Sequence, residues 1–140
     1  MDVLCKVLLL VTLCMLCVVA SVWDLKWRRI PNWLMIVGLV AGLFFHLWGC
    51  SLVDGLLGLL LGGVPWLFAG VGGGDIKFYG MCGFLLGLQG TVVSYCVLCV
   101  LSVAILGVLC LCGRLRWRDV IPFGPLIALA VVIAGVICYV

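Results

Sequence analysis

Residues 78–113 read FYGMCGFLLGLQGTVVSYCVLCVLSVAILGVLCLCG and contain no charged side chain. A helix crosses the hydrocarbon core of a bilayer with ~20 residues, so this stretch is too long for one crossing. Its clearest interruption is Gln89-Gly90, where a polar side chain adjoins a glycine. The sequence therefore predicts two spans here, Ile76–Leu88 and Thr91–Cys112. The first covers only roughly 20 Å of a ~30 Å core, which indicates a local recess or a thinned membrane.

The rest of the chain divides in the same way. Of its 140 residues, 68% are apolar and 9% are charged, whereas soluble domains average ~45–50% and ~25%. This composition excludes an ordinary soluble globule, a disordered tail and a nucleic-acid-binding module. Four further spans are predicted, at Val3–Val22, Asn32–Trp48, Leu52–Val71 and Val120–Val140. We expect an all-α fold, a polytopic membrane helical bundle of about six spans in one domain over residues 1–140. The first span lacks a clean cleavage site and is expected to be retained.

Basic residues support the six-span count. Seven of the eight basic residues lie in three segments that a six-span chain places on one side of the membrane. They are Lys26, Arg28, Arg29, Lys77, Arg114, Arg116 and Arg118. By the positive-inside rule these segments are cytoplasmic, and both termini lie outside. A five-span alternative, which merges the fourth and fifth spans, would place the last basic cluster opposite the first.

The cysteines form no recognisable metal site or disulfide framework. Cys14-x-x-Cys17 and Cys96-x-x-Cys99 have ligand-like spacing, but both pairs lie inside apolar segments without a histidine or an acid nearby. Free cysteine packs as a small hydrophobic residue. We therefore expect neither a metal nor another cofactor.

Glycines recur at a spacing of four within the predicted spans. The pairs are Gly38 with Gly42, Gly58 with Gly62, and Gly83 with Gly87. Such pairs allow helix backbones to approach closely in lipid. They predict helix packing and carry no direct functional information.

Two aspartates stand at the predicted cytoplasmic boundary. Asp24 follows the first span, and Asp75 precedes the fourth after three consecutive glycines. Acids in such positions are costly and mark functional sites. Two carboxylates that lie close together cannot both ionise, so the pair shares one proton. The ionised group can then activate a water while the protonated group donates to a scissile carbonyl. In the alternative interpretation each aspartate pairs with a nearby cation among the lipid headgroups, namely Lys26, Arg28 or Lys77.

Three motifs resemble those of the type IV prepilin peptidases. Residues 24–34, DLKWRRIPNWL, are similar to the family's first catalytic-aspartate motif, and residues 72–77, GGGDIK, to its Gly-x-Gly-Asp-x-Lys motif. Residues 121–125, IPFGP, resemble the Pro-Phe-x-Pro element that opens the last span. The motifs follow the family's order and spacing over essentially the whole chain. The resemblance implies a six-span aspartic endopeptidase of the GxGD type, in which Asp24 and Asp75 are catalytic.

The resemblance also implies a substrate and a location, and it argues against an N-methyltransferase activity. Family members cleave the basic leader from prepilins at the cytoplasmic face of the membrane. Long members carry a cytosolic loop with two Cys-x-x-Cys pairs and an N-methyltransferase activity, but only residues 24–31 join the first two spans here. The chain is therefore similar to the short, peptidase-only members found with Flp/Tad-type pili. We expect a multi-pass protein of a bacterial-type cytoplasmic (inner) membrane, with a prepilin-like substrate and the bilayer as partners and no nucleic acid.

Six more residues are candidates for substrate binding or for supporting the two aspartates. They are Gly72, Gly74, Lys77, Asn32, Pro122 and Pro125. The glycines leave room for a substrate backbone, and carbonyls freed by the prolines could hold an extended substrate. The alternatives are structural: an interfacial cation for the lysine, a helix start for the asparagine and a helix-start kink for the prolines.

Two polar residues outside these motifs are expected to be structural. Asp54 lies on the opposite side of the membrane from Asp24 and Asp75, so it is expected to be a solvated loop residue. His46 stands alone near the outer end of the second span and is expected to be a hydrogen-bonded structural residue.

Two other classes of function compete with the peptidase interpretation. A small transporter, or an ion- or proton-coupled carrier, could use the same aspartate pair, and a structural subunit would need no catalysis. A relay would place acids at several depths, whereas both aspartates lie at one boundary. Transporters built on inverted repeats show internal symmetry, which is not evident here. A structural subunit has no need of three glycines before an aspartate, so the peptidase interpretation is preferred.

Overall fold

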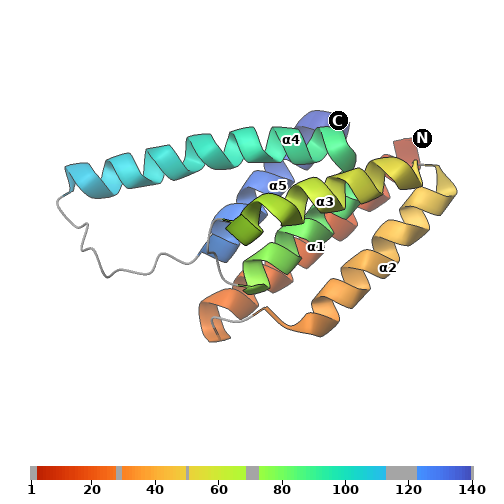
Figure 1. The fold of residues 1–140 in the computed structure, drawn as a ribbon, viewed down its shortest axis with the longest axis horizontal. Helices are drawn as coiled ribbons and strands as arrows, with labels where there is room; N and C mark the ends of the chain where they lie inside the picture. The colour runs from red at the N-terminus through yellow and green to blue at the C-terminus, as the bar shows by residue number, and fades with distance from the viewer. Residues whose placement is uncertain (1–2, 28–29, 50, 69–72, 113–122, 140) are drawn as a thin grey trace.

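The computed structural model describes residues 3–27, 30–49, 51–68, 73–112 and 123–139. All regular structure in these ranges is helical, which confirms the all-α prediction (Figure 1). The helices are α1 (Val3–Trp27), α2 (Asn32–Trp48), α3 (Leu52–Phe68), α4 (Gly73–Leu111) and α5 (Phe123–Tyr139). Five of the seven basic residues for which a cytoplasmic location is predicted lie outside the described ranges, namely Arg28, Arg29, Arg114, Arg116 and Arg118.

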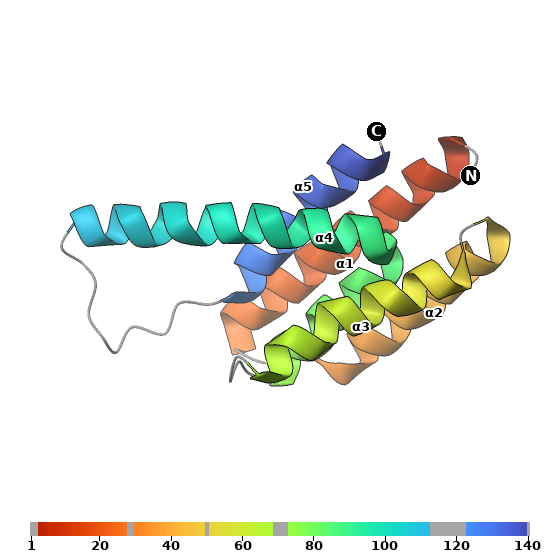
Figure 2. The ribbon, with the colours of Figure 1, turned by 45° about the horizontal axis from the view of Figure 1, so that its top comes forward.

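Helix α4 consists of two arms that meet at Gly87, where φ is 69° and ψ is −176°. This backbone conformation is essentially restricted to glycine. The arms, residues 73–86 and 88–111, run in different directions (Figure 2). The predicted break within this apolar run is therefore present, but it lies at Gly87. Gln89-Gly90, where the break was expected, belongs to the second arm.

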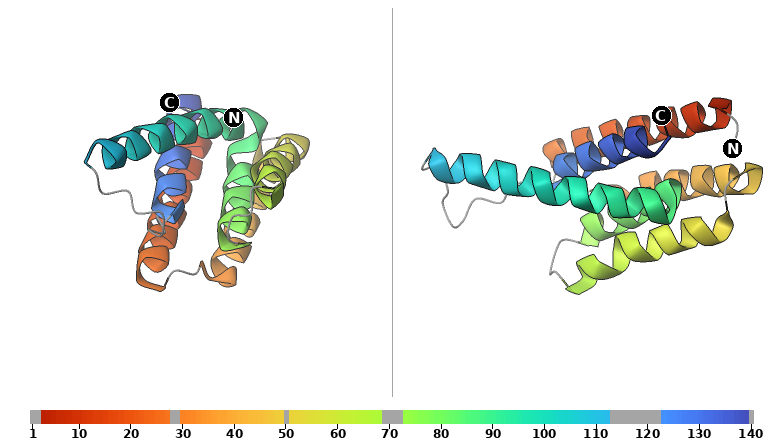
Figure 3. Two further views of the ribbon diagram at one scale, coloured as in Figure 1. Left: turned by 60° about the vertical axis from the view of Figure 1, so that its left-hand side comes forward. Right: turned by 90° about the horizontal axis from the view of Figure 1, so that it is seen from above.

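The helices run back and forth between two ends of the bundle. The end of α1 and the start of α4 lie together at one end, and the start of α1, the end of α5 and the kink in α4 lie at the other (Figure 3). Contacts are most extensive between α3 and α4, followed by α4 with α5 and α1 with α5. The second arm of α4 crosses α5, and its far end projects away from the other helices.

The outer surface is suited to lipid. Helices α1 and α4 are long and apolar enough to cross a membrane, and the other three helices provide shorter apolar stretches. Large apolar side chains are exposed along α1, α2 and the second arm of α4. Soluble proteins rarely expose such extensive apolar surface, so the structure agrees with a helical membrane protein. The six-span count and the outside location of the termini stay predictions.

Glycines bring α3 onto the first arm of α4. A Cβ atom on Gly58 would collide with the carbonyl oxygen of Gly83, and one on Gly62 would lie 2.7 Å from the carbonyl oxygen of Tyr79. The backbones can approach this closely only because the side chains are absent. Close packing by Gly58, Gly62 and Gly83 is therefore confirmed.

Side chains from α2 and α3 bond the backbone groups on either side of the kink. In a continuous helix the Leu88 N–H would donate to the carbonyl of Phe84. Here the Leu88 N–H donates to Asp54 Oδ1 over 3.1 Å, and His46 Nε2 donates to the Phe84 carbonyl oxygen over 2.6 Å. The structural role expected for His46 is confirmed. The interpretation of Asp54 as a solvated loop residue is wrong, because its half-buried carboxylate accepts the first N–H after the kink.

Two hydroxyl groups complete this arrangement. Tyr139 Oη donates to the carbonyl of Leu86 over 2.9 Å, and Thr91 Oγ1 donates to the carbonyl of Gly87 over 2.6 Å. An unbonded backbone group in lipid costs several kcal/mol. These bonds therefore permit a sharp break in an apolar helix. We call the region with these bonds the kink end; it comprises His46, Asp54, Phe84, Leu86, Gly87, Leu88, Thr91 and Tyr139.

Candidate active site

Asp24 lies in the last turn of α1, which continues to Trp27 and does not end at Val22 as predicted. The carboxyl group is half-buried. Its neighbour Trp23 packs edge-on against Trp33 of α2, with ring centroids 6.0 Å apart and ring planes at 80°. This aromatic contact joins the end of α1 to the start of α2 and holds the backbone that carries Asp24.

The start of α5 packs directly against Asp24. A Cβ atom on Gly124 would lie 2.8 Å from Asp24 Cγ and would also collide with Oδ2. A residue without a side chain is therefore required at this contact. The first turn of α5 has N–H groups without intrahelical partners and the positive end of the helix dipole, and both favour a nearby carboxylate.

Asp75 lies in the first turn of α4, which begins at Gly73 and not at the predicted Ile76. Its carboxyl group is half-buried. The adjacent Gly74 approaches the segment between α1 and α2, where a Cβ atom would lie 3.8 Å from Ile30 Cβ. The start of α4 is thus placed beside the segment that follows Asp24.

The structure brings Asp24 and Asp75 together at one end of the bundle, which we call the dyad end. The two groups are close enough for their negative charges to repel each other. Within the described ranges, neither carboxyl group has a hydrogen-bond or salt-bridge partner. Two carboxyl groups that repel each other ionise less readily together than singly. One group can then accept a proton from water while the other donates one.

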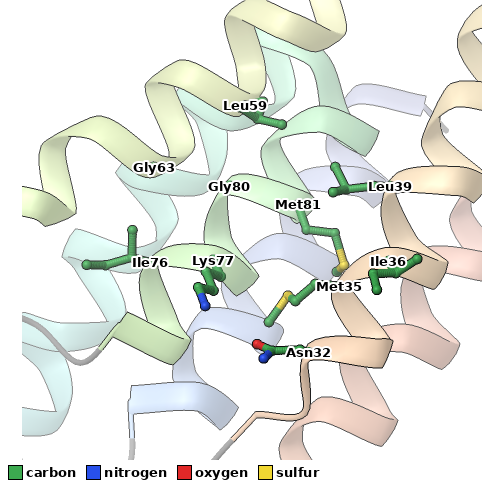
Figure 4. Close-up of a pocket in the computed structure, with 10 residues that line it drawn as sticks. All are labelled: Asn32, Met35, Ile36, Leu39, Leu59, Gly63, Ile76, Lys77, Gly80 and Met81. Carbon is green, nitrogen blue, oxygen red and sulfur yellow. The ribbon is translucent and has the colours of Figure 1, made fainter.

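The alternative of ion pairing is not observed for the two described lysines. The Lys26 ammonium lies over the ring of Trp27, 5.8 Å from its centroid. Lys77 is exposed and lies at a cavity between α2, α3 and α4, together with Asn32 (Figure 4). The third proposed partner, Arg28, lies outside the described residues.

The remaining predicted residues are only partly placed. Pro125 follows Gly124 in the first turn of α5 and is half-buried. Gly72 and Pro122 lie outside the described residues. Among the described residues, no group of three or more His, Cys, Asp or Glu side chains could hold a metal ion.

Gly124 is the site residue that sequence reasoning missed. It stands between two prolines at the start of the last helix, in the residues 121–125 that carry the third motif. The motif indicated this segment, but only the docking of α5 on α1 shows that the glycine is the residue in contact with Asp24.

Comparisons with known proteins extend over nearly the whole chain. Residues 11–140, which include Asp24 and Asp75, match the type IV leader peptidase family. A prepilin leader peptidase/N-methyltransferase of Bacillus subtilis (strain 168) is 31% identical over 127 residues, covering 85% of this chain and 51% of the relative. A second one, of Burkholderia pseudomallei (strain 1026b), is 30% identical over 129 residues, covering 83% of this chain and 42% of the relative. The chain thus spans about half or less of the curated relatives it matches. No solved structure matches it.

Proposed function

The chain belongs to the type IV leader peptidase family, and we propose that it is a membrane-embedded aspartic endopeptidase that cleaves the leader of prepilin-like substrates. The observation that carries the proposal is the pairing of Asp24 and Asp75, two half-buried acids from different helices whose charges repel each other. Sharing a proton lets such a pair act as general base and general acid in the same step.

The proposed reaction is a water-mediated hydrolysis. The ionised aspartate takes a proton from a water held between the two carboxyl groups, and that water attacks the carbonyl carbon of the scissile peptide bond. The protonated aspartate donates to the carbonyl oxygen and stabilises the tetrahedral intermediate. Transfer of a proton to the leaving amine then breaks the C–N bond and releases the leader.

The proposed setting is a multi-pass protein of a bacterial-type inner membrane with the dyad end at the cytoplasmic face. Six helical segments, with α4 counted as two arms, would place Lys26 and Lys77 on that side and both termini outside. We assign only peptidase activity, on a Flp-type prepilin with a basic leader, because only residues 28–31 join α1 to α2. The alternative of a transporter is not favoured, since the family name denotes peptidases.

Cleavage of a candidate Flp-type prepilin tests the proposal. The chain is co-expressed with the prepilin, and the shift in mobility on loss of the leader is followed in wild type, Asp24→Asn, Asp75→Asn and Asp54→Asn. We expect Asp24→Asn and Asp75→Asn to reduce cleavage at least ~10³-fold, because each removes one of the two proton-transfer groups. Asp54→Asn is the matched control and should cleave normally, since an amide oxygen can still accept from Leu88. Cleavage that survives in either dyad variant would overturn the aspartic mechanism.

A further inference from the structure

The described helices form two groups, and the two aspartates belong to different groups. Helix α1 packs mainly on α5, whereas the first arm of α4 lies with α2 and α3 (Figure 3). The direct contact between α1 and α4 is the least extensive of the helix pairs that touch within the described ranges. Asp24 stands on α1 and Asp75 on α4. The distance between their carboxyl groups therefore depends on the few contacts that join these two helices.

Cys17 of α1 and Cys82 of the first arm of α4 make one of these contacts. Their thiol groups are hydrogen-bonded to each other, and the two side chains are only 2% and 0% exposed. Both cysteines are free. A thiol is a weak hydrogen-bonding group, so the bond itself contributes little to stability. The contact matters because it fixes a width, since buried side chains are close-packed and a larger pair would hold the helices further apart.

The cysteine pair lies in register with the aspartate pair. Asp24 is seven residues after Cys17, and Asp75 is seven residues before Cys82. Seven residues make about two helical turns, so each aspartate shares a helix face with its cysteine and lies roughly 10 Å further along the axis. The two helices are antiparallel, and both steps run toward the dyad end. The two pairs therefore lie one above the other between α1 and α4.

One buried residue on each helix separates the two pairs. Ala20 lies three residues after the cysteine of α1 and four before its aspartate, and Tyr79 has the same place on α4, three residues before the cysteine and four after the aspartate. Each is only 1% exposed. Steps of three and four residues are the spacing with which two helices keep one face in contact. In this register the small Ala20 stands opposite the large Tyr79, so the space between the helices is filled from the cysteines to the dyad end.

We propose that Cys17 and Cys82 are positioning residues that set the separation of Asp24 and Asp75. The proposal rests on the proposed peptidase function and specifies what holds its two acids at a working distance. The thiol contact fixes the width between α1 and α4, and two turns of each helix transfer that width to the dyad end. A wider contact moves the carboxyl groups apart, so that one water no longer reaches both. Because both cysteines are buried, they act on the rate of bond cleavage and not on the affinity for substrate.

Widening the contact and then narrowing it again tests the proposal. Cys17→Leu adds bulk between the helices, and Cys17→Val adds less, which provides a second variant if leucine lowers the folded yield. Combining Cys17→Leu with Cys82→Ala removes bulk from the facing side. Cys14→Leu is the matched control, because Cys14 lies about one turn earlier on the same helix and is only half-buried. The kcat and KM for prepilin cleavage are measured per folded molecule, with the full chain reconstituted into phospholipid vesicles.

We expect Cys17→Leu to lower kcat about 10²-fold, because a displacement of ~1 Å at a reacting group costs about that much. Cys17→Val should lower kcat by a smaller factor, and KM should stay within about twofold of wild type in both variants. Adding Cys82→Ala should restore at least about tenfold of the kcat lost in Cys17→Leu, because residues in contact do not act additively. Cys14→Leu should cleave as wild type does. A purely structural role would change the folded yield and leave kcat per folded molecule unchanged.

Three results would overturn the proposal. If wild type cleaves and folded Cys17→Leu and Cys17→Val keep its kcat, the thiol contact does not set the separation of the aspartates. An equal loss in Cys14→Leu would show that activity responds to any added bulk on α1. A loss in Cys17→Leu that Cys82→Ala fails to reduce would show that the width of the contact is not the cause. Failure of wild type to cleave any prepilin would instead overturn the peptidase function itself.

Discussion

The two ends of the first arm of α4 use the same residue types in opposite ways. At each end an aspartate from another helix lies against a glycine. Asp24 of α1 lies against Gly124 of α5 at the dyad end, and Asp54 of α3 lies against Gly87 of α4 at the kink end. At the kink end the carboxylate accepts a backbone N–H over 3.1 Å. At the dyad end Asp24 and Asp75 lie close enough for their charges to repel each other, and neither has a bonded partner among the described residues.

We infer that this difference separates structural polar groups from the proposed catalytic ones. At the kink end His46 and Asp54 bond the Phe84 carbonyl and the Leu88 N–H, which a continuous helix would bond to each other. Such bonds stabilise the fold and leave little capacity for a ligand. The dyad end instead brings two half-buried carboxyl groups together without a bonded partner, and groups perturbed in this way are typical of catalytic pairs. Substitutions at the kink end should therefore lower stability, and substitutions at the dyad end should lower activity.

Gly87→Ala should have the largest effect, and it should act on stability. At φ 69° and ψ −176° an alanine costs about 1–3 kcal/mol of strain. Its Cβ would also lie 3.0 Å from Asp54 Cγ, which displaces the carboxylate from Leu88. We expect a total loss of about 3 kcal/mol or more and a marked fall in the thermal unfolding midpoint in detergent. Gly107→Ala, whose Cβ would meet nothing within 4 Å, should unfold like wild type. Equal stability of both variants would show that the kink is not specified by Gly87.

Gly124→Ala should have the next largest effect, and it should act on activity. Its Cβ would lie 2.8 Å from Asp24 Cγ, so the carboxyl group must move, and a displacement of ~1 Å at a reacting group can cost ~10²-fold in rate. The loss should appear in kcat for leader cleavage, with the folded yield in detergent retained.

Gly135→Ala is the matched control for this prediction. Gly135 is also on α5 and faces α1, but its Cβ would lie 3.1 Å from the methyl carbon Leu13 Cδ2, which is the end of a flexible side chain. This variant should keep kcat within about twofold. If both variants lose activity equally, Gly124 acts through general packing of α5 and not through Asp24.

The two ends were not equally predictable from the sequence. The pairing of Asp24 and Asp75 was expected because both follow from short motifs and from the alternation of helices across the membrane, and the structure brings them together. The break in α4 was predicted near Gln89 because polarity was the available signal. Its actual position depends on Asp54, which is distant in sequence and bonds the N–H that follows Gly87.

Contacts between residues that are distant in sequence also explain why the role of Gly124 and the surroundings of Gly63 were not predicted. The IPFGP motif marks the segment that contains Gly124, but the role of this glycine depends on the docking of α5 against the end of α1. Gly63, whose Cβ would meet nothing within 4 Å, belongs to the same helix as the close-packed Gly58 and Gly62, and the sequence does not show which of the three lie against α4. Local motifs therefore indicated the proposed reacting groups, whereas the residues that shape their surroundings could be found only from the packing of the helices.

His46→Leu should have a smaller effect than either glycine substitution, again on stability. The leucine keeps the bulk but leaves the buried carbonyl of Phe84 without its donor, at a cost of about 1–3 kcal/mol. His46→Gln is the matched variant, because its amide can still donate to that carbonyl, and it should recover part of the loss. Unfolding in detergent measures both, and leader cleavage per folded molecule should be unchanged. A loss of cleavage in folded His46→Leu protein would mean that the kink end also serves catalysis.

Asp54→Ala should have the smallest effect of the four predicted substitutions. It gives the most direct test of the comparison between the kink end and the dyad end. The carboxylate acts as the N-terminal cap of the second arm of α4, and loss of such a cap costs about 1 kcal/mol. Asp54→Asn retains an acceptor for the Leu88 N–H and should cost only a few tenths of a kcal/mol. Both should cleave prepilin at the wild-type rate per folded molecule, whereas Asp75→Asn should be inactive yet as stable as wild type or more so, because it removes a like-charge repulsion. The opposite pattern, with stability lost at Asp75 and activity lost at Asp54, would show that bonded and unbonded acids do not distinguish structure from function here.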